Sequence, residues 1–271
     1  MDARPIGVFD SGVGGLTVFR ALAAALPDEA LVYLGDTARV PYGPKSAETV
    51  RRYAREASRF LKRQDVKMMV VACNTVSSVA MEAMEEGADV PVVGVILPGA
   101  QRAVEASRRG RIGVIGTRAT VASEAYARAI HALRPAAEVV SRACPLFVPL
   151  AEEGWTDNAV VRQVADTYLT PLREADVDTL VLGCTHYPLL RGVLQETMGP
   201  EVVLVDSAES VAQEVRRRLA SDERLAHAPG TTPPRFFVTD APGPFLDVAQ
   251  RFLGEPVLHL ERAELESAPA W

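Results

Sequence analysis

The fold is decided by the sequence IGVFDS at residues 6–11, because the chain contains a second version of it, IGVIGT, at residues 112–117. Both are short apolar runs rich in β-branched residues, which predicts buried strands. Two further pairs follow at nearly the same spacing. VVAC at residues 70–73 resembles VLGC at residues 181–184, and VVGV at residues 92–95 resembles VVLV at residues 202–205. Three anchors in the same order predict two similar units, each with one cysteine at the end of a strand.

The segments between these anchors alternate between strand and helix patterns. Strand-like runs cover Ile6 to Phe9, Leu31 to Leu34 and Met68 to Val71, and helix-period segments cover Leu16 to Leu26 and Thr49 to Arg63. This alternation is typical of parallel α/β proteins. We therefore expect an α/β fold of two pseudo-symmetric lobes. Each lobe has a mainly parallel sheet flanked by helices, with an active site in the cleft between them.

The predicted lobe boundaries follow from the same anchors. The length of 271 residues favours two modest domains at roughly 150 residues each. The first lobe is expected to comprise residues 1–97 and 207–271, and the second residues 98–206. A further strand from Phe236 to Asp240 comes after the second lobe is complete, so the tail is expected to pack back on the first lobe.

Composition excludes several classes of protein. Hydrophobic residues make up 48% and charged residues 24%, as in ordinary globular proteins and unlike disordered chains. The net charge is −6, from 29 basic and 35 acidic residues, and such a field repels phosphate backbones. We therefore expect no nucleic-acid partner.

The sequence also predicts a cytoplasmic protein without a membrane segment. The most apolar stretch, Val90 to Ala100, is shorter than the roughly 20 residues of a spanning helix and is interrupted by proline and glycine. Asp2 and the early strand leave no room for a signal peptide. Three cysteines, an odd number, fit a reducing compartment.

Chemistry is expected where polar residues follow apolar strands, because ligands of open α/β sheets bind at the carboxyl ends of strands. The chain offers five such places: Asp10-Ser11, Asp36 with Tyr42-Gly43, Cys73-Asn74-Thr75, Glu152, and Cys184-Thr185-His186.

Cys73 and Cys184 are the most informative of these residues. A helix start is predicted after each of them, and a helix N-terminus lowers the pKa of a thiol. Two thiols on opposite sides of a cleft suit inversion at a carbon that bears hydrogen, since one removes the proton and the other supplies one to the opposite face. Asp10, His186 and Glu152 are the candidate proton partners, although spacing does not separate Glu152 from Glu153. Cys144, among apolar neighbours, is expected to be a packing residue.

Other types of site fit less well. The glycine-rich run after Asp10 has Thr17 where a dinucleotide-binding fingerprint needs its third glycine, so we expect it to hold a small carboxylate. The cysteines and the four histidines show no metal-ligand spacing, and no metal site is expected. A pyridoxal-phosphate racemase would need a lysine, and among three lysines only Lys45 is a candidate. A non-catalytic amino-acid binding protein would need no paired thiols.

Five segments together closely resemble the bacterial glutamate racemases of the aspartate/glutamate racemase superfamily. The segments are FDSGVGG at residues 9–15, Asp36 through Pro41-Tyr42-Gly43, ACNT at residues 72–75, Cys144-Pro145-Leu146 through Glu152-Glu153-Gly154, and GCTHYP at residues 183–188. The resemblance runs from about Ile6 to Ser210 in the correct order. The segments after Cys184 and at Asp10 resemble the glutamate branch more than the aspartate branch.

The resemblance implies a cofactor-independent isomerase that interconverts L- and D-glutamate and supplies D-glutamate for peptidoglycan synthesis, and so for cell-wall biogenesis and cell shape. By the same analogy Cys73 acts on D-glutamate and Cys184 on L-glutamate, assisted by Asp10, Glu152 and His186. The residues expected to bind the amino acid are Asp10, Ser11, Tyr42, Gly43, Asn74, Thr75, Thr185 and His186. Members of the family are often dimers, so a homodimer is a form that the resemblance allows.

Overall fold

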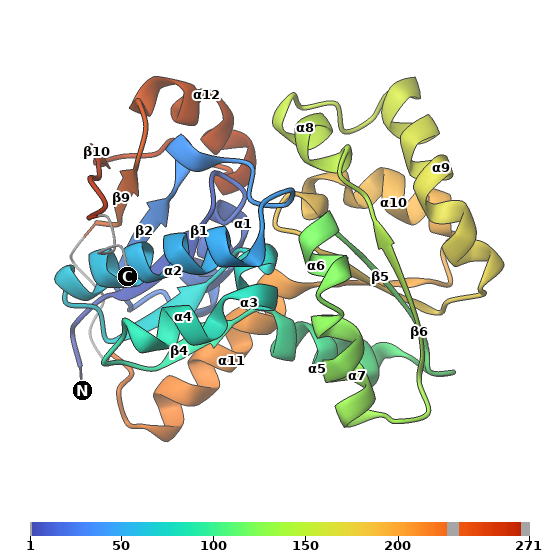
Figure 1. Cartoon of the computed structure of the whole chain (residues 1–271), viewed down its shortest axis with the longest axis horizontal. Coiled ribbons are helices and arrows are strands. Elements are labelled where there is room, and N and C mark those ends of the chain that lie inside the picture. The colour runs from blue at the N-terminus through green and yellow to red at the C-terminus, as the bar shows by residue number, and fades with distance from the viewer. Residues whose placement is uncertain (1, 227–232, 267–271) are drawn as a thin grey trace.

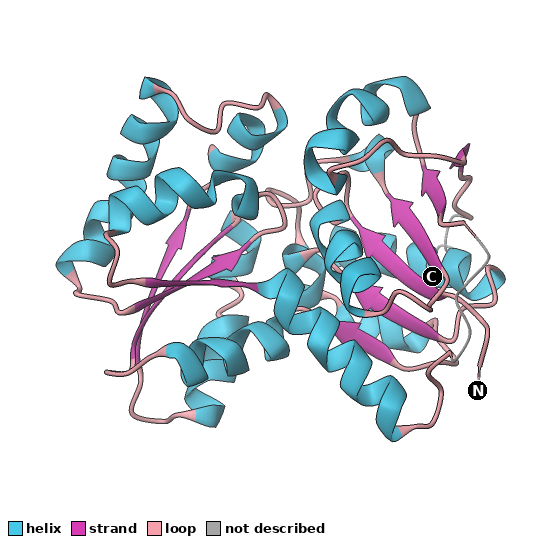
Figure 2. Cartoon of the chain, turned by 180° about the vertical axis from the view of Figure 1, so that it is seen from behind, coloured by secondary structure: helices cyan, strands magenta, loops and turns pink. Residues whose placement is uncertain are grey.

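The protein has two lobes, each built on its own parallel sheet with helices on both faces (Figures 1 and 2). This computed structural model describes residues 2–226 and 233–266. The sequence-based prediction of two similar α/β lobes is confirmed.

The sheet of the first lobe has six strands, all paired in parallel. Their order across the sheet is β10 (Leu260–Arg262), β9 (Arg235–Val238), β2 (Leu31–Gly35), β1 (Ile6–Asp10), β3 (Met68–Val71) and β4 (Val92–Gly94). Strands β1, β2 and β3 are buried at every residue, which is why they are continuous apolar runs without alternation.

The sheet of the second lobe has four parallel strands. Their order is β6 (Glu138–Ala143), β5 (Arg111–Gly116), β7 (Thr179–Gly183) and β8 (Val203–Asp206). The order β6-β5-β7-β8 repeats the order β2-β1-β3-β4 of the first lobe. The three sequence anchors are therefore the strand pairs β1 and β5, β3 and β7, and β4 and β8.

Helices follow the strands in both lobes. The first lobe carries α1 (Leu16–Ala25), η1 (Thr37–Arg39), α2 (Ala47–Arg63), α3 (Asn74–Val79) and α4 (Met81–Glu86). The second carries α6 (Arg118–Ala122), α7 (Ala125–Leu133), α8 (Phe147–Glu152), α9 (Ala159–Glu174), η2 (Tyr187–Leu190) and α10 (Arg191–Met198). Side-chain caps fix several starts: Ser46 accepts the Thr49 N–H before α2, and Asn158 accepts two N–H groups before α9.

The chain crosses between the lobes twice among the described residues. It leaves the first lobe after β4 through α5 (Ile96–Ala106) and returns after β8 through α11 (Ser207–Ser221), which Asp206 caps. Helix α11 packs along α1 of the first lobe and also against α5. The lobe boundaries 1–97 with 207–271, and 98–206, stay a prediction.

The tail adds two strands and a helix to the first lobe. Strand β9 pairs with β2, and β10 pairs with β9. Between them α12 (Pro242–Leu253) packs against α1, at the side of the lobe that faces α8 (Figure 1). The Phe236 ring lies 4.9 Å from that of Phe19, so aromatic packing joins the tail to the core.

Candidate active site

Strand β1 ends in Asp10, whose carboxyl group is fully buried. Its Oδ2 accepts the Gly12 N–H at 2.9 Å, whereas Oδ1 has no hydrogen-bond partner among the described residues. Burial raises the pKa of Asp10, and the charge of His186 and the backbone N–H groups of the glycine loop act in the opposite direction. A buried carboxyl group with one free oxygen can serve as a proton donor or acceptor for a ligand.

The glycine loop after Asp10 reaches the second lobe. A Cβ atom on Gly14 would overlap Thr185 Oγ1 and His186 Nδ1. Thr17, at the start of α1, donates to the Thr185 carbonyl at 3.2 Å. The first and second lobes therefore meet at this loop, and only glycine fits at position 14.

Asp36, after β2, holds the segment that carries Tyr42 and Gly43. The Tyr42 hydroxyl donates to Asp36 Oδ2, and Asp36 also accepts from Arg39 Nε at 2.7 Å and from Thr239 Oγ1 at 2.8 Å. Burial, followed by the Asp36 charge, raises the pKa of Tyr42, so its hydroxyl stays protonated. Tyr42 is thus fixed by Asp36, and the Gly43 carbonyl accepts the Ala119 N–H of the second lobe at 3.2 Å.

Cys73 follows β3 and is the N-cap residue of α3. Its side chain is 5% exposed, and its Sγ lies 3.4 Å from Ser11 Oγ. Burial raises the pKa of Cys73 to about 12, and the Asp10 charge adds to this; the Ser11 hydroxyl and the Val76 N–H only partly oppose it. The helix N-terminus thus lowers this pKa only in part, as the Val76 N–H shows, because desolvation of the thiolate outweighs the helix.

Asn74 and Thr75, the next residues, bridge to the second lobe. The Tyr126 hydroxyl of α7 donates to Asn74 Oδ1 at 2.8 Å, and Asn74 Nδ2 is buried with no partner among the described residues. Thr75 Oγ1 lies 2.9 Å from Thr117 Oγ1, which follows β5. The free Asn74 N–H groups leave a donor for a ligand at the seam between the lobes.

Cys184 follows β7, the counterpart of β3, and is 6% exposed. No α-helix begins directly after it: the next element is the short 3₁₀ helix η2, and α10 starts only at Arg191. The helix start predicted after this thiol is thus present, with Pro188 in its first turn, but the helix is of the tighter 3₁₀ type.

An imidazole and a carboxylate stand beside Cys184. His186 Nδ1 lies 3.8 Å from Cys184 Sγ, and His186 Nε2 lies 2.9 Å from Glu152 Oε1 at the end of α8. Burial alone would lower the pKa of His186, but the hydrogen bonds to Cys184 and Glu152 raise it to about 10. The geometry selects Glu152 over Glu153, a choice that spacing left open.

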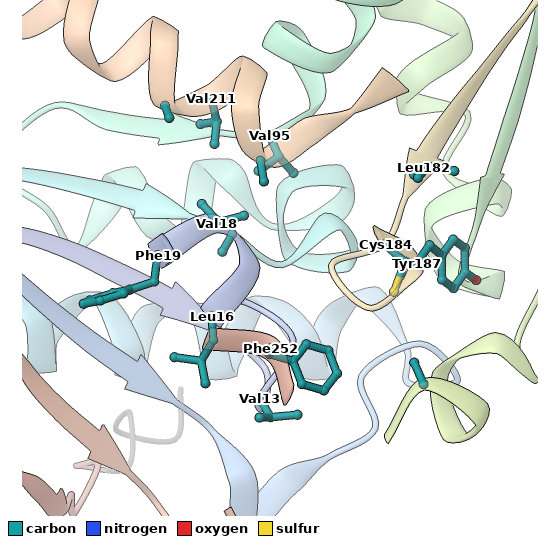
Figure 3. Packing of buried hydrophobic residues seen from close by; sticks show 14 of the residues in the cluster. Val13, Leu16, Val18, Phe19, Val95, Leu182, Cys184, Tyr187, Val211 and Phe252 are labelled. Carbon is teal, nitrogen blue, oxygen red and sulfur yellow. The ribbon is translucent and has the colours of Figure 1, made fainter. Parts of the chain in front are cut away.

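The structure brings both thiols and their partners to one seam between the lobes. Cys73 and Cys184 belong to different hydrophobic clusters, yet a charge on Cys184 acts on the pKa of Cys73, and Asp10 is similarly coupled to His186. Figure 3 shows Cys184 on its loop next to Tyr187, in the same hydrophobic cluster as Val13, Leu16 and Phe252. The sulfur atoms thus share an electrostatic environment.

Sequence reasoning missed several residues of this seam. Thr117 had a signal, because it occupies in the second lobe the position that Ser11 occupies in the first. Tyr126 and Phe252 had none, since their contacts join elements far apart in the sequence. Cys144 is fully buried and its carbonyl accepts from the Tyr187 hydroxyl at 2.8 Å, in keeping with the packing role expected for it.

Each of the three lysines has a partner outside the seam. Lys67 is buried against Glu29 at 2.6 Å, Lys62 pairs with Asp89, and Lys45 lies over the Tyr53 ring.

Within residues 2–226 and 233–266, no group of three His, Cys, Asp or Glu residues is placed to hold a metal ion. Over the same residues, no helix combines the length and the apolar character needed to cross a bilayer.

Comparison with known proteins places this arrangement in a family. The model of the Asp/Glu/Hydantoin racemase family matches residues 6–215. A glutamate racemase from Geobacter metallireducens is 55% identical over 267 residues, which cover 98% of this chain and 99% of the relative.

Solved structures agree with this result. Glutamate racemase RacE1 from Bacillus anthracis has a TM-score of 0.93 and 40% identity, covering 98% of this chain and 99% of that one. The glutamate racemase from Francisella tularensis, solved with D-glutamate, has a TM-score of 0.93 and 38% identity over 99% and 100% of the two chains. The chain therefore belongs to the Asp/Glu/Hydantoin racemase family and, within it, to the glutamate racemases, which are isomerases.

Proposed function

We propose that the chain interconverts L- and D-glutamate without a cofactor, with Cys73 and Cys184 as the two bases on opposite faces of the substrate. The observation that carries this proposal is the placement of the thiols. They follow corresponding strands, β3 and β7, each is nearly buried, and each has its own polar partner at the seam, Ser11 for Cys73 and His186 for Cys184.

The reaction is balanced by one proton removed and one returned. With L-glutamate, the Cys184 thiolate takes the α-proton as the C–H bond breaks and the S–H bond forms, and the Cys73 thiol gives its proton to the opposite face. The raised pKa of Cys73, about 12, keeps that thiol protonated and ready to donate. The His186 imidazolium compensates the charge on Cys184, and in the reverse direction the thiols exchange roles.

Unpartnered polar atoms support an amino-acid substrate. Asp10 Oδ1 can accept from an ammonium group, and Asn74 Nδ2 can donate to a carboxylate. Ser11, Thr75 and Thr185 add hydroxyl groups, and the segment of Tyr42 and Gly43 adds backbone groups. The F. tularensis relative was solved with D-glutamate, which supports glutamate as the ligand here.

The biological role is proposed from the same family membership. D-glutamate made by this chain would feed peptidoglycan synthesis, and with it cell-wall biogenesis and cell shape, in the cytoplasm. The homodimer stays a prediction, to be checked by the mass of the purified protein in solution.

The direct test is to incubate the purified protein with L-glutamate in D₂O without added cofactor. We expect deuterium at the α-carbon and optical rotation falling to zero, whereas aspartate should exchange far more slowly. Binding without exchange would instead support the amino-acid binding protein. An absorption band of an internal aldimine would support the pyridoxal-phosphate enzyme.

A further inference from the structure

Helix α12 belongs to the first lobe but ends at the active site. Ala249, Phe252 and Leu253 are buried against the lobe, and the Phe245 ring lies 6.3 Å from that of Tyr33. Gly254, with a φ of +87°, ends the helix in the left-handed conformation that glycine adopts without strain. The last turn of α12 is therefore held firmly in place.

The last turn of α12 contacts His186, the partner of Cys184, and Glu152, the partner of His186. The Phe252 ring lies 5.1 Å from the His186 ring at an interplanar angle of 77°, an edge-to-face arrangement. The neighbouring residue, Arg251, donates from its guanidinium group to the Glu152 carbonyl oxygen. Two consecutive residues of one lobe thus contact both members of the His186–Glu152 pair of the other lobe.

These contacts fix the orientation of the His186 ring and the position of Glu152, on which proton transfer at Cys184 depends. The His186 ring must present Nδ1 to Cys184 and Nε2 to Glu152 at once, so a small ring rotation would break one of the two contacts. Phe252 is fully buried and blocks that rotation from one side while excluding water. Arg251 fixes the end of α8, from which the Glu152 carboxylate reaches the imidazole.

Residues 242–253 also lie beyond residues 6–215, where the family model matches. The contacts therefore come from a part of the chain that the family model does not cover. Among the hydrogen bonds, ion pairs and ring contacts of the described residues, none joins α12 to the Cys73 side. The partners there, Asp10 and Ser11, come from β1 and the loop after it.

We propose that α12 is a positioning helix for one side of the reaction: Phe252 and Arg251 hold the His186–Glu152 pair in register with Cys184. Neither residue touches the substrate, and both act through the pair. The inference rests on the proposed two-thiol function, and it assigns to the tail a role in proton transfer at Cys184 and not at Cys73.

The test uses Phe252→Leu and Arg251→Ala in the full chain. Because a small misplacement of a reacting group lowers rates strongly, we expect kcat to fall about tenfold or more. Since the two enantiomers are equal in free energy, kcat/KM falls equally in both directions. The directional readout is the primary isotope effect on kcat/KM, which should rise with α-deuterated L-glutamate and fall with α-deuterated D-glutamate. Arg251→Lys should restore much of the rate.

Phe245→Leu is the matched control, because it removes the same kind of ring from the same helix but lies against Tyr33. It should lower the melting temperature as Phe252→Leu does without changing the ratio of the isotope effects measured with α-deuterated L- and D-glutamate.

If the wild type is active and this ratio stays at the wild-type value in both Phe252→Leu and Arg251→Ala, the positioning role is overturned. A wild type that does not racemise glutamate overturns the proposed function instead. Arg251 is exposed, so its variants test the proposal even where Phe252→Leu does not fold.

Discussion

The two lobes share the order of four strands but differ in what surrounds their thiols. Cys73 follows β3 and Cys184 follows β7, the corresponding strand of the second sheet. Beside Cys73 stand Ser11 and the Asp10 carboxyl group, whereas beside Cys184 stands the His186–Glu152 pair. A repeated scaffold thus determines where the sulfur atoms lie, and the loops after the strands determine which polar groups surround each of them.

The difference also concerns charge. The Asp10 side is buried with one unpartnered oxygen, and burial raises the pKa of both Asp10 and Cys73. On the other side, the pKa of His186 is raised to about 10, so this imidazole is cationic near neutrality. The lobes are therefore similar in backbone and differ in the polar groups beside their thiols, a buried carboxyl group on one side and a cationic imidazole on the other.

The largest effect is expected when each thiol is removed in turn. Cys73→Ser and Cys184→Ser should each lower racemisation by roughly 1,000-fold or more, since a serine hydroxyl is a far weaker acid than a thiol. The measurement is circular dichroism of glutamate during turnover. Activity within tenfold of wild type in either variant would refute the two-base assignment.

Replacing the proposed proton partners tests whether each of them serves only one thiol. Asp10→Asn and His186→Asn should each slow turnover by about 100-fold, in the range of general acid–base catalysis. The isotope effect on kcat/KM should rise for α-deuterated D-glutamate in Asp10→Asn and for α-deuterated L-glutamate in His186→Asn. Identical isotope patterns in the two variants would mean that the partners are not specific to one side.

The pH dependence of alkylation tests the charge state of Cys73. Because its pKa lies at about 12, the thiolate fraction should rise about tenfold per pH unit between pH 7 and pH 10. Labelling by iodoacetamide, followed by mass spectrometry of the Cys73 peptide in the Cys184→Ser variant, should therefore show no plateau in this range. A plateau below pH 9 would contradict the dominance of burial.

The smallest effect is expected at the third cysteine. Cys144→Ser should leave kcat within about twofold of wild type and lower the free energy of unfolding by about 1–3 kcal/mol, because it places a hydroxyl group in a fully buried site. Denaturant unfolding and the turnover assay measure the two quantities. A loss of activity as large as that of Cys73→Ser would give Cys144 a role in the reaction.

The sequence predicted the scaffold better than the electrostatics. The repeated anchors identify β3 and β7 as counterparts, and thus Cys73 and Cys184 as a pair, because strand order follows from local patterns that a sequence displays. The pKa of Cys73 could not be predicted, since it depends on burial by distant segments. Arg251 and Phe252 were missed for a similar reason: about 100 residues separate Arg251 from Glu152.

The glycine at position 14 has one more consequence. Because a single added methyl group there would collide with Thr185 and His186, residue 14 acts as a spacer of minimal thickness that sets how closely the two halves of the enzyme can approach. Any larger residue would push the loop after Cys184 away from the loop after Asp10 and so separate the two sides of the seam, while the fold of each lobe stays intact.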